Sequence, residues 1–462
     1  MDHPSPQTPA PTPTNRPSPN RSSNHSSNQR STDGRAVVLV DGVRVPFMRS
    51  GGHYLDLLAY DLARSAVRGL LERTGLEPAS LDRVIMGIVM QNPKTSNVAR
   101  EAALGAGIPN SVPAYTVTMA CISSNQAITS AAELVASGQA DAVIAGGTES
   151  LSDVPIGFGK ALRKKLYQLR KVESVWAYRK LFRGLSLSDL VPRTPGIEEY
   201  STGESMGEYG DKLAAMFGVS RKDQDEYALR SHQNAARATR EGKLSAEITP
   251  VAVPPRFDPL DTDNTVRPDT SMDKLSKLPP VYVKPYGTIT AGNASPLTDG
   301  AAATLVMSEQ KALALGLTPK AYLRHYCYVA QDPYEELLLG PAYAVPKLLD
   351  EAGLEPGDID VIEFHEAFAG QVLAVLTALG SDTFARDKLG RSSRAFEVDM
   401  DILNRWGGSI SLGHPFGATG ARLVTTAANR LHDEDGQFAL VTACAAGGLG
   451  HALIVERYEG SA

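Results

Sequence analysis

One pattern occurs twice in this chain and constrains its fold more than any other feature. The first copy spans residues 116–147, where a short β-rich run ends at Cys121 and a helical pattern follows. An apolar run over 142–145 then closes into Gly146-Gly147. This order predicts a strand, a helix and a strand, with the cysteine where the first strand becomes the helix. Free backbone N–H groups and the positive end of the helix dipole at that point favour a thiolate over a thiol.

The second copy begins at His414, which opens a helical pattern over residues 417–431. A strand pattern at 438–442 follows, and it ends at Cys444 just before a second pair of glycines. The order of reactive residue, helix, apolar strand and glycine pair is the same in both copies. We therefore expect two halves that repeat one topology, as internal duplication produces.

Strand patterns alternate with helical patterns elsewhere, which predicts an α/β fold with a mostly parallel sheet covered by helices on both faces. We expect an N-terminal half over residues 36–152, completed by 296–320, and a C-terminal half over 321–462. Residues 153–295 are longer than a crossover needs, more polar and richer in proline, and they indicate an inserted loop domain. A strand and its exit are expected over residues 36–47, and further strands near residues 83–89, 302–307, 322–329, 360–364 and 452–455.

Residues 1–35 form a separate compositional class, rich in Pro, Ser and Asn, and we expect a disordered tail. The tail lacks the apolar core of a secretory signal, and its prolines disfavour the amphipathic helix of a mitochondrial transit peptide. The 3 cysteines are too few for a disulfide framework and indicate a reducing compartment. We therefore expect a cytoplasmic protein. The net charge of −6 gives no general attraction to nucleic acid, and no apolar run is long enough to span a bilayer.

Within the insertion, residues 160–183 are strongly basic, with apolar residues at helical spacing among the charges. One interpretation is a solvated helix that covers the domain. The other is an amphipathic helix that contacts an acidic membrane surface or a partner subunit. The sequence leaves both open.

Four reactive side chains stand where strands are expected to end: Cys121, His365, His414 and Cys444. Ligands of parallel α/β sheets bind beyond the carboxyl ends of the strands, so two halves packed with pseudo-twofold symmetry would bring the four together. A histidine beside Cys121 would make that cysteine a nucleophile. A second thiol suits proton transfer near neutral pH, because its ordinary pKa of about 8.5 is easily lowered. Backbone N–H groups after Cys444 could hold an oxyanion.

Each of these residues also has a structural interpretation, because a lone Cys or His is often a packed or hydrogen-bonded core group. Cys327 lies in an apolar run and is interpreted in that way. Metal binding is not favoured, because the cysteines and histidines are not paired at close ligand spacing.

These residues and their surroundings resemble the thiolase family over nearly all of residues 36–458. The motif HEAFA, where many thiolases have NEAFA, is similar to the subgroup formed by the β subunits of fatty-acid oxidation trifunctional enzymes and their bacterial relatives. The matching stretches are TVTMACISSNQ (116–126), AGGTE (145–149), QDEYALRSHQ (224–233), GTITAGNASPLTDGAAA (287–303), HEAFA (365–369), GGSISLGHPFGATG (407–420) and CAAGGLG (444–450).

The resemblance implies that Cys121 is the acylated nucleophile, that His414 activates it and that Cys444 is the second acid/base. It implies one oxyanion hole from His365 and His414, and a second from the N–H groups of Cys121 and Ala446.

The resemblance also implies binding residues. Ser295 is expected against the pantetheine arm of coenzyme A, and Met206 in the acyl pocket. Thr118 and Ser124 depart from the commonest thiolase pattern and fit the trifunctional subgroup, so they bear on substrate choice more than on activity.

The implied fold has duplicated βαβαβαββ halves in five layers, α-β-α-β-α, with the inserted loop domain. The implied reaction is cleavage of a 3-oxoacyl-CoA by coenzyme A into acetyl-CoA and a shortened acyl-CoA, through a thioester on Cys121, in fatty-acid β-oxidation. Coenzyme A is a substrate, and no metal or redox cofactor is needed. The family implies at least a homodimer, and the subgroup implies a hydratase/dehydrogenase α subunit as partner.

Three alternatives stay open. A biosynthetic thiolase (acetyl-CoA C-acetyltransferase) would join two acetyl-CoA molecules. A decarboxylating ketoacyl synthase would use one cysteine and two histidines and give Cys444 no role. A non-catalytic acyl-CoA-binding scaffold would use residues 160–183 for docking, although every expected reactive position is filled.

Overall fold

A computed structural model of the chain describes residues 35–196 and 198–460. Its main feature is a 10-stranded sheet with the order β12-β13-β14-β11-β1-β10-β5-β3-β4, in which β2 (Met48–Arg49) pairs with β10. The strands of the first half are β1 (Val37–Arg44), β3 (Arg83–Gly87), β4 (Ala114–Val117), β5 (Ala142–Glu149) and β10 (Thr298–Ser308). Those of the second half are β11 (Ala321–Ala330), β12 (Ile359–Phe364), β13 (Phe438–Ala445) and β14 (Leu449–Arg457).

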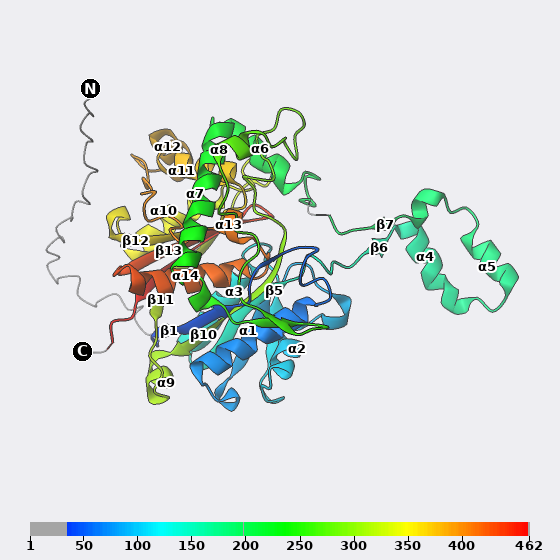
Figure 1. Ribbon diagram of the computed structural model, residues 1–462, viewed down its shortest axis with the longest axis horizontal. Coiled ribbons are helices and arrows are strands. Elements are labelled where there is room, and N and C mark those ends of the chain that lie inside the picture. Colours follow the sequence, from blue (N-terminus) through cyan, green and yellow to red (C-terminus); the bar gives the residue numbers. More distant parts are fainter. Residues whose placement is uncertain (1–34, 197, 461–462) are drawn as a thin grey trace, which may run out of the picture. The chain divides into compact units, whose positions relative to one another are not determined.

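Helices lie on both faces of the two half-sheets and between them, which gives the five layers expected from the sequence (Figure 1). One outer layer holds α1 (Ala59–Thr74) and α2 (Val98–Gly105). The opposite outer layer holds α10 (Gly340–Ala352) and α11 (Ala369–Leu379). The central layer is formed by α3 (Ser123–Ala136) and α14 (Thr419–Asp433), whose apolar side chains share one core with strands of both halves.

The two central helices approach each other closely because small or polar residues stand at their contact. A Cβ atom at Gly420 would lie 2.0 Å from Oδ1 of Asn125. The Ala421 N–H donates to Oγ of Ser124 at 3.0 Å. Since Cys121 precedes α3 and His414 precedes α14, this close contact brings the two reactive residues to one place.

The prediction of a mostly parallel sheet is wrong. Only the pairs β3–β4, β3–β5 and β12–β13 run parallel, and the other named neighbours in the sheet run antiparallel. One reason is the short connection from β13 to β14, where Gly447 and Gly448 both have positive φ. A turn this tight can join only antiparallel neighbours, whereas parallel strands need a crossover.

The second half differs from the first at the edge of the sheet. In the first half, β4 pairs with the edge of β3. At the corresponding edge of β12 in the second half, Leu403 forms only an isolated parallel bridge with Ile362. The next residue, Asn404, has φ +44, so the backbone turns away. The Asn404 side chain makes the backbone hydrogen bonds that a neighbouring strand would make: Oδ1 accepts from the Phe364 N–H at 2.7 Å, and Nδ2 donates to the Phe364 carbonyl at 2.9 Å.

Residues between β5 and β10 contain the helices α6 (Met206–Met216), α7 (Arg221–Arg240) and α8 (Met272–Ser276), which pack near α11 and contribute to its core. The boundaries of an inserted domain at 153–295 stay a prediction, and the expected tail, apart from Arg35, lies outside the described residues. Smaller elements elsewhere are β8 (Val251–Val253), β9 (Asp258–Leu260), α9 (Glu309–Ala314), α12 (Asp382–Leu389) and α13 (Ser409–Leu412).

The basic segment forms two helices rather than one. They are α4 (Lys160–Gln168) and α5 (Val175–Phe182), joined to the rest by the ribbon β6 (Gly157–Phe158) and β7 (Pro192–Arg193) (Figure 1). The break falls at Ser174, whose Oγ accepts from the Ala177 N–H and caps α5. We call residues 157–193 the basic arm. Leu162 is the one buried side chain of α4 and α5, so a helix that covers the domain is not what the structure shows.

Candidate active site

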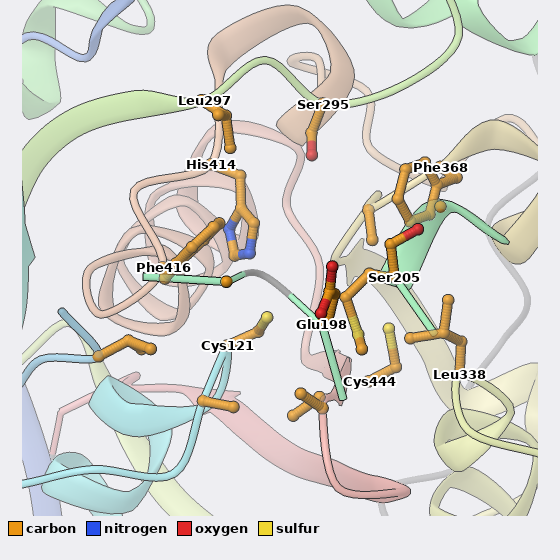
Figure 2. A pocket seen from close by; sticks show the side chains of 18 of the residues that line it. Cys121, Glu198, Ser205, Ser295, Leu297, Leu338, Phe368, His414, Phe416 and Cys444 are labelled. Carbon is orange, nitrogen blue, oxygen red and sulfur yellow. The ribbon is translucent and has the colours of Figure 1, made fainter. Parts of the chain in front are cut away.

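A cavity of about 330 Å³ lies beside the first turns of α3 and α14 and the end of β13 (Figure 2). Both sulfur atoms, of Cys121 and Cys444, face into it, and His414 stands close to Cys121 (Figure 2). Apolar side chains, among them Leu338 and Phe368, form its further wall. Six of the residues predicted from the sequence line this one cavity: Cys121, Met206, Ser295, His414, Cys444 and Ala446.

Cys121 sits on a tight turn between β4 and α3. Ala120 holds a left-handed φ of +47, a conformation that a residue with a Cβ adopts at some cost in energy. Ser123 closes the turn: its Oγ accepts from the Met119 N–H at 2.8 Å and donates to the Ala120 carbonyl at 2.7 Å. The turn thus lifts the Cys121 side chain out of the sheet and toward the cavity.

The expectation that Cys121 rests as a thiolate is wrong. Burial raises the pKa of Cys121 to about 12, and the hydrogen bond from the Ala446 N–H only partly opposes this. The nearby Glu149 carboxylate raises the pKa further, while the backbone N–H of Cys121 itself lowers it. The helix dipole does not outweigh burial here, so the proton must be removed during the reaction. The same two N–H groups surround the sulfur as a backbone oxyanion hole requires.

His414 is buried and held from both sides. Its backbone N–H donates to Oγ1 of Thr298 at 3.1 Å, and its Nδ1 lies 2.6 Å from Oγ1 of Thr419. Burial, with smaller contributions from His365 and Arg422, holds the pKa of His414 well below its ordinary value. The ring is therefore neutral near pH 7 and free to accept a proton. Within the described part of the chain, its Nε2 has no hydrogen-bond partner.

His365 lies behind His414 rather than on the cavity wall. The two ring centroids are 4.1 Å apart, and the Cys121 sulfur and one ring nitrogen of each histidine lie within 4.8 Å of one another. Burial, and to a smaller extent the charge of Arg422, lower the pKa of His365 to about 3. This imidazole is also neutral, so it can donate a hydrogen bond from one nitrogen without carrying charge.

The two remaining cysteines differ as expected from the sequence. Cys444 is buried at the end of β13 and lines the cavity, and burial together with the adjacent Cys121 raises its pKa. It therefore holds a proton at rest. Cys327 packs in the core under α10, where its Sγ lies 3.3 Å from the Ala344 carbonyl.

Ser295 is positioned by the segment that carries HEAFA. Its backbone N–H donates to the Ala367 carbonyl at 3.0 Å, and its side chain points into the cavity (Figure 2). Met206 begins α6 at the cavity wall. Thr118 and Ser124, by contrast, are not among the residues that line the cavity, and Ser124 instead joins the two central helices.

Two buried carboxylates that the sequence reasoning missed assemble the site. Glu149 accepts from the backbone N–H groups of Val89 at 3.1 Å, Met90 at 2.8 Å and Gly417 at 3.0 Å, so it ties the first half to the loop that carries His414. Glu366, next to His365, accepts from four donors, on Tyr227, Ser231, Asn404 and Ile410. A carboxylate at the end of a buried strand, as in AGGTE, was the available signal.

This constellation can be compared with known proteins. The model of the thiolase N-terminal domain matches residues 37–310, and that of the thiolase C-terminal domain matches residues 317–457. The chain belongs to the thiolase family. It is therefore an acyltransferase that takes coenzyme A as a substrate and no other cofactor, so the grouping of Cys121 with two histidines is given no metal role.

Individual relatives support the family. The chain is 55% identical to the mitochondrial trifunctional enzyme subunit beta of Bos taurus over 92% of this chain and 89% of that protein. It is 46% identical to a 3-ketoacyl-CoA thiolase of Yersinia enterocolitica over 92% of this chain and 97% of that protein. The crystal structure of human mitochondrial 3-ketoacyl-CoA thiolase superposes with a TM-score of 0.78 at 31% identity, over 92% of this chain and 99% of that chain.

The expected cytoplasmic location is wrong. Trifunctional enzyme beta subunits of cattle, mouse and human, 54–55% identical to this chain over at least 91% of its length, are named as mitochondrial. The prediction rested on the prolines within residues 1–35 and on the small number of cysteines, and a reducing interior is not particular to the cytoplasm. Within residues 35–196 and 198–460, no helix has both the length and the apolar character that a membrane span requires.

Proposed function

We propose that this thiolase cleaves 3-oxoacyl-CoA with coenzyme A into acetyl-CoA and a shortened acyl-CoA, as in fatty-acid β-oxidation. The observation that supports this most is that two thiols and an imidazole, of Cys121, Cys444 and His414, line one cavity. A nucleophile, its base and a separate acid are the groups that this reaction needs.

In the first half-reaction, Nε2 of His414 accepts the Cys121 proton while the sulfur attacks the keto carbon. The carbon–carbon bond then breaks, and the electron pair moves onto the acetyl-CoA fragment as an enolate. Cys444 gives its proton to that carbon, and acetyl-CoA leaves. The shortened acyl group remains on Cys121 as a thioester.

In the second half-reaction, the Cys444 thiolate takes the proton of the incoming coenzyme A thiol. The new thiolate attacks the thioester carbonyl, and Cys121 leaves and regains its proton from His414. The N–H groups of Cys121 and Ala446 stabilise the oxyanion at the thioester, and His414, with the His365 ring packed behind it, stabilises the enolate oxygen. A well-placed donor of this kind contributes about 3–4 kcal/mol to the transition state.

Apolar groups in the cavity wall favour acyl chains longer than acetyl over the biosynthetic joining of two acetyl-CoA. Met206, Leu338 and Phe368 line this wall together with the sulfurs. Initial rates of thiolysis across a series of 3-oxoacyl-CoA chain lengths test this proposal. Rates that peak at the four-carbon substrate would favour the biosynthetic thiolase instead.

Acylation of Cys121 separates the enzyme from a scaffold. Incubation with acetyl-CoA should add one acetyl group by intact mass, and Cys121→Ala should abolish the addition. A chain that forms no adduct but still binds acyl-CoA would be a scaffold. Cys444→Ser separates a thiolase from a decarboxylating synthase, because only the synthase would continue to condense malonyl thioesters.

We also propose a dimer through the free edge of the sheet. β4 is the last strand in the sheet order, and Tyr115 on it is exposed. An unpaired strand edge with exposed apolar groups is a surface that a second copy can extend. The sedimentation equilibrium of the purified chain tests this, and a monomer at micromolar concentration would contradict it. A hydratase/dehydrogenase α subunit is proposed as the further partner.

The basic arm is proposed to contact an acidic membrane surface. Its apolar side chains point outward, with Val175 and Trp176 each 77% exposed and Tyr167 73% exposed. Exposed aromatic residues between lysines and arginines are typical of a helix that lies in a lipid interface.

The arm is tested by sedimentation with vesicles that contain phosphatidylglycerol. Arg163, Lys164 and Lys171 changed together to Gln should reduce vesicle binding severalfold and leave soluble turnover intact. A matched control changes three exposed cations outside the arm, Lys222, Arg256 and Lys277. Equal losses in both variants would exclude a specific membrane contact, and binding to the α subunit alone would point to the partner instead.

A further inference from the structure

We infer that Glu199 is a positioning residue, which holds the turn after Cys444 so that the Ala446 N–H points at the Cys121 sulfur. This role rests on the proposed function, because the backbone oxyanion hole belongs to that reaction. The contact that supports it joins the segment before α6 to the turn after β13: Oε2 of Glu199 accepts from the Gly447 N–H at 2.7 Å.

The turn after Cys444 is built on two glycines, so its own side chains do not fix its shape. Gly447 has φ +86 and Gly448 has φ +68, a region that glycine enters at no steric cost. The last pair of the β13–β14 ladder is Ala445 with Leu449, and Gly447 is exposed. The position of the residues beyond the ladder therefore depends on hydrogen bonds from other segments.

Two segments far apart in the sequence bind the turn at successive residues. The Gly447 N–H donates to Glu199, and the Gly448 carbonyl accepts from the Gln331 N–H at 2.8 Å. The Glu199 bond orients the peptide group that joins Ala446 to Gly447. Ala446 is thus held between the ladder on one side and Glu199 on the other, and its own N–H donates to the Cys121 sulfur.

Glu199 is held in a tight hairpin over residues 198–205, which we call the hairpin. Glu198 and Ser205 form an antiparallel bridge at its base. The Glu199 N–H donates to the Glu204 carbonyl at 2.9 Å, and the Glu199 carbonyl accepts from the Gly203 N–H at 2.8 Å. Both backbone groups of Glu199 are therefore bonded within the hairpin, which limits where its side chain can reach.

Further contacts anchor the hairpin and the Glu199 carboxylate. Oγ of Ser201 donates to Oε1 of Glu199 at 3.1 Å, which leaves Oε2 for the turn. The Ser201 carbonyl accepts from the Tyr334 hydroxyl at 3.4 Å, and Ser205 caps α6. The preceding residue, Glu198, lines the cavity (Figure 2). The hairpin thus presents one carboxylate to the cavity and the next to the turn.

A carboxylate beside an oxyanion hole acts in two opposing ways. As an acceptor, Glu199 orients the Gly447 N–H, whereas its negative charge opposes the charge that develops on the substrate oxygen. Glu199 is only half-buried, so solvent screens the charge while the hydrogen bond persists. Glutamine at this position would keep an acceptor and remove the charge, so it separates the two effects.

Hydrogen exchange of the full-length protein tests the contact without turnover. In Glu199→Ala, the Gly447 amide, followed in short peptides that cover residues 443–449, should exchange at least about tenfold faster because it has lost its acceptor. Glu199→Gln should keep the exchange rate of the unmodified protein. An unchanged rate in Glu199→Ala would show that the turn does not depend on Glu199 and would overturn the inference.

The exchange of labelled coenzyme A into acetyl-CoA tests the effect on the chemistry. In this reaction the Cys121 sulfur takes the acetyl group and coenzyme A leaves as its thiol, and labelled coenzyme A then reverses the step. It requires the N–H groups of Cys121 and Ala446 but no carbon–carbon cleavage. Glu199→Ala should lower kcat about fivefold to fiftyfold with KM within about twofold, because loss of a whole donor costs about a hundredfold to a thousandfold.

Glu199→Gln should keep kcat for this exchange within about threefold. Glu204→Ala is the matched control, because Glu204 is exposed on the same hairpin and its carboxylate faces Tyr209 rather than the turn. It should leave kcat within about twofold.

Three outcomes would refute the positioning role. Equal losses in Glu199→Ala and Glu204→Ala would assign the effect to the hairpin as a whole, and equal losses in Glu199→Gln and Glu199→Ala would assign it to charge. Unimpaired exchange in Glu199→Ala, in a protein whose Cys121 forms the acetyl adduct, would refute this role alone. Absence of that adduct in the unmodified protein would instead refute the proposed function.

Discussion

Glu149 gives the sharpest test of the physical reasoning, because its charge is fully buried and its hydrogen bonds hold the site together. Burial raises its pKa from 4.5 to about 7, although the N–H groups of Met90, Val89 and Gly417 oppose the shift. The folded state therefore holds a proton that the unfolded state has released between about pH 4.5 and 7. Stability from this group is present below that window and is lost as pH rises through it.

The perturbation is Glu149→Gln, which keeps the shape and removes the titration. A pKa raised from 4.5 to about 7 corresponds to about 3.5 kcal/mol, at about 1.4 kcal/mol for each tenfold change in proton affinity. Part of this is lost below pH 5, so we expect the unfolding free energy of the unmodified protein, relative to the variant, to fall by about 2.5 kcal/mol from pH 5 to pH 8. Against this, the amide cannot accept all three N–H groups, which costs the variant about 1–3 kcal/mol at every pH.

Urea unfolding of both proteins at pH 5, 6, 7 and 8 measures the difference. The constant cost of the unmatched N–H cancels from the pH dependence, so only the titration of Glu149 remains. A difference that stays flat from pH 5 to pH 8 would refute the burial argument, because it would mean that the backbone donors outweigh burial and that Glu149 is ionised throughout.

Three further predictions concern the same site. Gly147→Ala should destabilise the protein by about 1–3 kcal/mol and lower kcat, because the new Cβ would lie 1.8 Å from the Gly417 carbonyl oxygen. Chemical unfolding and steady-state kinetics measure the two effects, and an unchanged unfolding midpoint would contradict the prediction. Cys444→Ala should still form the acyl adduct of Cys121 from acyl-CoA but should lose at least about a hundredfold in thiolysis, as intact mass and product release report; full turnover would remove Cys444 from the mechanism. Because the pKa of Cys121 is raised, its alkylation by iodoacetamide should keep accelerating from pH 6 to pH 9, whereas a plateau across this range would indicate a resting thiolate.

The reactive residues could be predicted from the sequence because each marks a change of element: Cys121, His365 and Cys444 lie at strand ends, whereas His414 lies between α13 and α14. Glycines or a change in the spacing of apolar residues occur next to Cys121, His414 and Cys444. These signals can be recognised from neighbouring residues in the sequence alone. The resting protonation of Cys121 could not be predicted, because it depends on how much protein surrounds the sulfur.

The supporting residues were missed for a related reason. Glu366 accepts hydrogen bonds from residues that are 38 to 139 positions away in the sequence. Nothing in the HEAFA motif shows which donors its carboxylate will face. The direction of the strands was also mispredicted. Alternation of strands and helices predicts the layers of the fold, but it does not show whether β10 and β14 run parallel or antiparallel to their neighbours.

The unequal ends of the large sheet limit how many copies can join. At β12 the outward N–H and carbonyl groups of Phe364 are both bonded to the Asn404 side chain, whereas at β4 the Asn97 side chain bonds one outward carbonyl, that of Ala114, through Nδ2 at 3.0 Å. In a dimer formed through β4, the outer edge of each copy would be β12, where the Asn404 side chain already binds the backbone of Phe364. Growth by strand addition would then stop at a pair, so one amide side chain would keep a ten-stranded sheet from becoming the start of a fibre.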